Sequence, residues 1–162
     1  MMAMIQIVTA FFGSLGFAML NNIRGIKLLY AAIGGMLAWS LNLLLGQWLH
    51  NEVSQYFITA IFITIYAEIC ARIKKTPTTT FLITGIIPLV PGSALYYSMS
   101  YAVNGLWDKF LSNSIYTVTL AVALAIGIMV ASSLAIAYLR IVEYLGREKL
   151  LAVGDKKRAK NF

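Results

Sequence analysis

Charge, histidine and cysteine are all scarce in this chain. Charged residues make up 12% of its 162 residues, where a soluble domain carries about a quarter, and 60% are hydrophobic. The mean hydropathy is +0.79. His50 and Cys70 are single copies, so a histidine-based metal site and an intrachain disulfide are excluded. A glycine-rich phosphate loop with its lysine is also missing, so the chain has no ATP site. We therefore expect an integral membrane protein that is not an enzyme and needs no cofactor.

Long apolar runs dominate the remaining sequence. A bilayer core requires about 20 apolar residues in a helix, and five segments approach or exceed that length. Short polar joints separate them. The sequence thus predicts an all-α, polytopic membrane protein with about five transmembrane helices, at residues 2–20, 28–49, 55–73, 81–103 and 115–139. The first run lacks a basic start and a clear cleavage site, so we interpret it as a retained helix and not as a signal peptide.

Basic residues are distributed on one side of this five-span arrangement. Lys109 is the only one of the thirteen that would face the opposite side. By the positive-inside rule, the N-terminus is outside and the C-terminus cytoplasmic. We expect a transmembrane domain at 1–140 and a basic cytoplasmic tail at 141–162, and we explain the net charge of +7 by membrane topology and not by nucleic-acid binding. The twelve residues on the cytoplasmic side are Arg24, Lys27, Arg72, Lys74, Lys75, Arg140, Arg147, Lys149, Lys156, Lys157, Arg158 and Lys160.

Proline is also rare, yet two of the three prolines lie inside the fourth apolar run, in "GIIPLVPGSALYY". Pro88 and Pro91 cannot donate to the carbonyls one turn earlier, and each costs about 3 kcal/mol inside a helix. Gly92 gives the backbone the freedom that a break needs. Lipid cannot satisfy the freed carbonyls, so the break must be buried in protein or line a wet cavity. Such broken helices form solute sites in transporters, although a kink that only shapes packing is the alternative.

Polar side chains follow the break at helical spacing. Ser93, Tyr96 or Tyr97, and Ser100 can share one face of the second half-helix. Their hydroxyl groups could contact a small solute or only water. We therefore name Ser93, Tyr96 and Tyr97, together with the break, as candidates for the transport path.

Glu68 is a carboxylate near the cytoplasmic end of the third span. Acidic groups within a membrane are costly and often mark a solute or proton path. Arg72 follows at i+4 and can neutralise it. We expect this pair to lie near the proline break and to serve transport; the alternative is an interfacial ion pair that anchors the helix end.

Small residues recur every four positions in the fifth span. This pattern allows close approach of helix backbones, either within the chain or between copies in a homo-oligomer. The stripe is Ala123, Gly127, Ala131 and Ala135. Ser40, Asn42, Thr117 and Thr119 are expected to form hydrogen bonds between helices, with only weak grounds for a role in solute contact.

The stretch "AEICARIKKTPTTTFLITGIIPLVPGSALYYSM", residues 67–99, resembles the small, YjjB-like subunit of the bacterial threonine/serine exporter (ThrE) family. The resemblance lies in the spacing of Glu68, Arg72, Pro77, Pro88 and the Pro91–Gly92 pair, and in the length and hydrophobic profile of nearly the whole chain. It implies export of threonine and serine, or of a dicarboxylate such as succinate, across the cytoplasmic membrane. It also implies a separate, larger partner subunit.

Two functions are therefore compatible with the sequence. The chain is an exporter subunit that contacts solute, or a scaffold that stabilises a larger transport subunit. An intramembrane protease is disfavoured because it needs further acids and histidines within the membrane. Without an ATP site, the driving force should be an ion gradient or the solute's own gradient. The solute, the coupling ion and the stoichiometry stay open.

Overall fold

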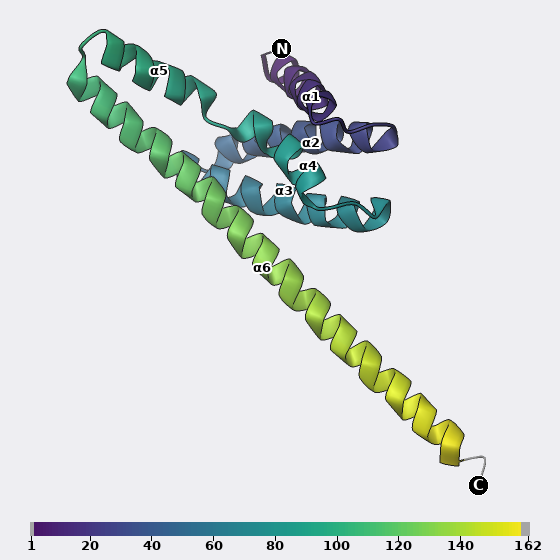
Figure 1. The fold of residues 1–162 in the computed structure, drawn as a ribbon. Helices are drawn as coiled ribbons and strands as arrows, with labels where there is room; N and C mark the ends of the chain where they lie inside the picture. The colour runs from purple at the N-terminus through teal and green to yellow at the C-terminus, as the bar shows by residue number, and fades with distance from the viewer. Residues whose placement is uncertain (1, 160–162) are drawn as a thin grey trace.

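Helices account for nearly the whole of the computed structural model, which describes the backbone of residues 2–159 and the side chains of 2–138 and 140. No strand occurs between residues 2 and 159, so the all-α prediction is confirmed. Figure 1 shows α1, α2, α3 and α4 gathered in one bundle, with α5 and the long α6 extending from it. The elements are α1 (Met2–Leu20), α2 (Ile26–Trp48), α3 (Glu52–Lys74), α4 (Thr79–Ile86), the 3-10 helix η1 (Ile87–Leu89), α5 (Gly92–Val103) and α6 (Trp107–Ala159).

Four of these helices are long and apolar enough to cross a bilayer. They are α1, α2, α3 and the Trp107–Tyr138 part of α6. The bent pair Thr79–Leu89 and Gly92–Val103 adds a fifth crossing if both parts form one span. The predicted membrane protein with about five spans is thus confirmed. Two boundaries differ from expectation: α6 begins eight residues earlier than residue 115, and it runs without interruption past residue 140.

Short turns join the helices, each with a local chemical cause. Gly25 has a φ of 68° in the α1–α2 turn, a conformation that costs glycine little. Asn51 caps α3 by accepting a hydrogen bond from the Val53 N–H at 3.0 Å. Lys75 ends α3 in the left-handed conformation, and the Thr76 N–H then donates to the Ala71 carbonyl at 3.0 Å. The short turn before Asn51 makes α2 and α3 antiparallel neighbours.

Glycines allow α2, α3 and α4 to pack closely. A Cβ placed on Gly34 of α2 would lie 2.8 Å from Cε1 of Tyr66, and one on Gly85 of α4 would lie 2.7 Å from Cδ1 of Ile63. Real Cβ contacts are not that short, so a side chain at either position would force Tyr66 or Ile63 to move. Phe81 of α4 is fully buried beside the α3 residue Cys70. The three helices therefore form a dense core without long apolar side chains at every contact.

The small-residue stripe of α6 packs on α3 of the same chain. Ala123, Gly127 and Ala131 are buried, and Ala135 is half-buried. A Cβ on Gly127 would meet the Cβ of Ala60 at 2.7 Å. Of the two alternatives left open by the sequence, the structure therefore shows the contact within the chain.

Three hydroxyl groups do not form the expected interhelical hydrogen bonds. Ser40 donates to the Met36 carbonyl at 2.7 Å, and Thr117 and Thr119 donate to carbonyls four residues earlier at 2.7 and 2.8 Å. Hydroxyl side chains readily bond to the preceding turn of their own helix, which uses the one proton they could donate to a neighbouring helix. The prediction was wrong for these three residues, and the side-chain oxygen of Asn42 likewise has no hydrogen-bond partner.

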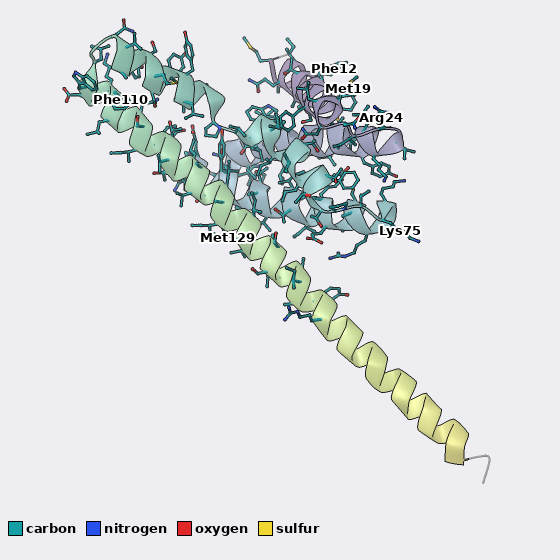
Figure 2. All side chains as sticks on the ribbon, in the orientation of Figure 1. Phe12, Met19, Arg24, Lys75, Phe110 and Met129 are labelled. Atoms are coloured by element: carbon teal, nitrogen blue, oxygen red, sulfur yellow. The ribbon has the colours of Figure 1, made fainter. Side chains whose placement is uncertain are left out.

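Basic residues from two different joints lie at one end of the bundle. The Lys74 Nζ lies 4.4 Å from the centre of the Tyr30 ring, which connects the end of α3 to the start of α2. Figure 2 shows Arg24 and Lys75 at this end and Phe110 far from them, near the start of α6. The fold therefore brings the basic joints of the first and third segments together.

Candidate functional site

The helix break occupies residues 87–91. Helix α4 ends at Ile86, η1 follows, and α5 starts at Gly92 with a bend of 55° between the two parts. Pro88 has no N–H to donate, and the chain responds with a tighter turn in which the Val90 N–H reaches the Ile87 carbonyl at 3.2 Å. The Gly92 N–H donates to the Val90 carbonyl at 2.7 Å. The two prolines thus account physically for the change of helix direction.

Two backbone donors at the start of α5 lack partners within the described part of the chain. Leu95 donates to the Pro91 carbonyl at 3.0 Å, but the N–H groups of Ser93 and Ala94 reach no acceptor there. Residues 79–89 rise roughly 16 Å, about half of a 30 Å hydrocarbon core. The break is therefore placed where lipid offers no hydrogen bond, provided that the bent pair is one span.

The polar face of α5 is exposed in this structure. Ser93 is exposed, and Tyr96 and Tyr97 are 69% and 54% exposed. The opposite face is tied to α6, because the Asn113 amide donates to the Ala94 carbonyl at 2.7 Å. That amide lies 2.9 Å from the Ser98 hydroxyl as well. Ser100 is half-buried. The side chains of Tyr96 and Tyr97 thus lie on the face of α5 that does not pack on α6.

Glu68 and Arg72 are brought together as expected from their spacing. The carboxylate accepts a hydrogen bond from the Arg72 guanidinium at 2.9 Å, and the Glu68 side chain is 17% exposed. At 42%, Arg72 is the more exposed of the two. The i,i+4 contact forms one charge-neutral unit near the end of α3.

The pair does not lie beside the proline break, which corrects our expectation. Helix α4 runs antiparallel to α3, so its first residues lie next to the end of α3, where Phe81 clusters with Ala67 and Cys70. Leu89, at the break, instead belongs to a cluster with Ala60 and Ile63, which lie nearer the start of α3 than Glu68 does. The antiparallel direction of the two helices thus separates the ion pair from the break along α3.

Three buried polar groups near the break lack partners, and our sequence reasoning overlooked two of them. Ser14 Oγ and Trp39 Nε1 were missed, and Asn42 Oδ1 was considered only weakly. Ser14 lies against Gly35, whose added Cβ would also meet Pro88 Cγ at 3.4 Å. The sequence did contain a signal for two of these groups, because Trp39 and Asn42 are spaced at i and i+3 and so share one face of α2.

Trp39 and Asn42 line two cavities that share lining residues, whereas Ser14 lines neither. One of about 440 Å³ lies between α1, α2 and the start of α3, and one of about 250 Å³ reaches the break. They share Gln6 and Trp39. Among the residues whose side chains are described, no three His, Cys, Asp or Glu residues lie close enough to hold a metal ion. The larger cavity is lined by Gln6, Trp39, Asn42, Leu43, Gly46, Gln47, Glu52, Gln55 and Tyr56, and the smaller by Gln6, Thr9, Ala10, Gly13, Trp39, Ile87 and Pro88.

Comparison with known protein families agrees with this architecture. A family model described as "Threonine/Serine exporter, ThrE" matches residues 6–134, which include the helix break and the Glu68–Arg72 pair. No match is found among curated proteins or among solved structures. Since the matched region covers more than half of the chain, the protein belongs to the threonine/serine exporter (ThrE) family.

Proposed function

We propose that this chain is the small subunit of an exporter of small hydrophilic metabolites in the cytoplasmic membrane. Its solute is threonine or serine, or a dicarboxylate such as succinate, and its driving force is an ion or solute gradient. Membership of the exporter family supports transport as the activity. The one-sided basic residues support an external N-terminus and a cytoplasmic C-terminus.

One observation carries the proposal, namely the interrupted helix with unpaired donors on Ser93 and Ala94. In hydrocarbon, each unpaired N–H would cost several kcal/mol. Water in a transport path or a contacting polypeptide can supply the missing acceptors, whereas lipid cannot. The broken helix is therefore best accommodated beside a hydrated path or a partner subunit.

A larger subunit of the same family is the partner we propose. Helix α5 makes its main contacts with α6 alone, while its Tyr96 and Tyr97 side chains are turned outward. Hydroxyl-bearing aromatic side chains suit a protein contact or a hydrated wall better than the centre of a bilayer. A second copy of this chain could cover the same face in a homo-oligomer.

Glu68 and Arg72 are proposed to act at the cytoplasmic end of the path. They belong to the end of α3 that also holds Lys74, where a solute would enter from the cytoplasm. A neutral ion pair can exchange its internal contact for one with a carboxylate or an ammonium group. This role would not require contact with the proline break.

The alternative is a scaffold that stabilises the larger subunit and does not contact solute. The outward orientation of the α5 tyrosines favours it, since these residues line neither of the two cavities described above. The scaffold hypothesis predicts that changes at the break which leave assembly intact also leave export intact.

An efflux experiment tests the proposed function. Cells co-expressing this chain and a larger subunit of the same family are loaded with serine, threonine or succinate, and the rate of loss is measured. Each subunit expressed alone serves as the control. Export that requires both chains supports the proposal. Export at the full rate by the larger subunit alone would contradict both roles considered for this chain, solute contact and scaffolding.

A further inference from the structure

We infer that the cavity between α1, α2 and the start of α3 is a solute-binding subsite, with Trp39 and Asn42 as its hydrogen-bonding residues. Its ligand is a small solute with a hydroxyl or ammonium group and no net negative charge. The inference rests on the proposed export function and adds to it a binding location and a ligand class.

The first argument is the unpaired state of two buried polar atoms. Asn42 is only 8% exposed, and its Oδ1 has no hydrogen-bond partner. The Trp39 Nε1 is buried and equally unpaired. A buried polar group without a partner costs free energy, and such groups are uncommon in proteins. A ligand that donates to Asn42 and accepts from Trp39 would satisfy both.

The second argument is the shape of the cavity around these atoms. Trp39 and Asn42 lie one turn apart on α2, and Gly46 follows one turn later without a side chain to fill the space. Gln55 of α3 forms part of the wall, with its amide Nε2 bound to the Leu49 carbonyl at 2.6 Å. Its Oε1 lies 3.4 Å from where a Cβ on Gly46 would be. With about 440 Å³, the cavity falls in the size range of small-molecule sites.

The third argument is continuity with the helix break. The smaller cavity contains Ile87 and Pro88 at one end and shares Gln6 and Trp39 with the larger cavity. Ser14, which is fully buried and unpaired, lies next to Pro88. The two cavities together thus reach from the break to the α2–α3 turn, as a solute moving between them would require.

Charge determines the class of ligand. Glu52 is the only formally charged residue lining either cavity, and its carboxylate accepts a hydrogen bond from the Tyr116 hydroxyl. No lysine or arginine is part of either lining. A dianion would therefore meet a carboxylate and no cation, whereas an ammonium or hydroxyl group would find acceptors.

The test compares Asn42→Leu with the control Ser40→Ala on the same helix. Ser40 bonds within its own helix and lines neither cavity, so its loss should leave binding unchanged. For the chain purified with its larger subunit, thermal unfolding is measured with serine, threonine, N-acetylserine and succinate. We expect serine and threonine to raise the unfolding temperature of the unaltered complex and of Ser40→Ala, with no shift from succinate or N-acetylserine.

Asn42→Leu should weaken the apparent affinity for serine and threonine by about tenfold or more. Without solute, its unfolding temperature should be unchanged or higher, because the variant removes an unpaired buried oxygen. Wild-type affinity in this variant would overturn the subsite. A larger shift with succinate than with serine in the unaltered complex would overturn the ligand class.

A second variant decides the question if Asn42→Leu fails to assemble. Gly46→Leu places a side chain into the larger cavity from an exposed position, where the nearest atoms to an added Cβ all belong to the Gln55 side chain, the closest at 3.4 Å. We expect the Gly46→Leu variant to assemble and to lose the serine-dependent rise in unfolding temperature. A retained rise would overturn the proposal.

Efflux of succinate alone by the unaltered complex would refute the ligand class while leaving export intact. Absence of all efflux would instead refute the proposed function.

Discussion

Gly127 of α6 lies against Ala60 of α3, so closely that a Cβ on Gly127 would come within 2.7 Å of the Ala60 Cβ and 2.8 Å of the Phe57 carbonyl oxygen. One of these obstacles is backbone and cannot rotate away. The long helix α6 is thus held to the bundle at a point that tolerates only glycine.

Gly127→Val should destabilise the protein by about 1–3 kcal/mol, because an added side chain forces α3 and α6 apart. Thermal unfolding in detergent measures the change. Ala125→Val on the exposed face of α6 is the matched control and should stay within about 0.5 kcal/mol of the unaltered protein. Equal stability of the two variants would contradict the observed α3–α6 contact.

Replacing both Pro88 and Pro91 with alanine should restore a continuous helix across the break. A continuous helix with these prolines would cost about 3 kcal/mol per proline, and alanine removes that obstacle, so insertion and stability should be equal or better. Efflux by the assembled exporter should fall to the background rate, because the path loses its interruption. Export at the unaltered rate by a properly assembled double variant would show that the break is structural and would favour the scaffold function.

Glu68→Gln should reduce efflux about tenfold or more while preserving the fold, because it removes the charge and keeps the shape and much of the hydrogen bonding. The loss in stability should be below about 1 kcal/mol, since the partner Arg72 is substantially exposed. Efflux and unfolding are measured on the same preparation.

Exchanging the two charges separates the roles of this pair. The double variant Glu68→Arg, Arg72→Glu keeps an i,i+4 ion pair, so it should rescue a purely structural anchor. We expect no rescue of efflux, because the solute would meet reversed charges. Full recovery would assign the pair to helix anchoring alone.

Reporter fusions test the orientation in the membrane. A reporter after Phe162 should be cytoplasmic, and one inserted near Asn51 should be external, because twelve of the thirteen basic residues would then face the cytoplasm. Alkaline phosphatase and fluorescent protein fusions report these sides by activity and fluorescence. Finding both reporters on one side would refute the five-span arrangement.

Local sequence properties determined the class of this protein and most of its helices. Apolar runs of about 20 residues leave few structures other than membrane helices, and polar joints with Gly25 and Asn51 mark where helices end. The break could be located because the effect of Pro88 and Pro91 on a helix is local. The Glu68–Arg72 contact also required only the period of one helix.

Tertiary packing decided which faces of these helices meet. Helices that are apolar on all sides carry little periodic signal, so the sequence could not show that Ser14 lies beside Pro88 or that Trp39 and Asn42 border a cavity. The direction of α4 against α3 likewise separated Glu68 from the break, where we had expected the two to lie close together. Such relationships depend on contacts between segments distant in the chain, where close approach at positions such as Gly35 and Gly127 selects one arrangement.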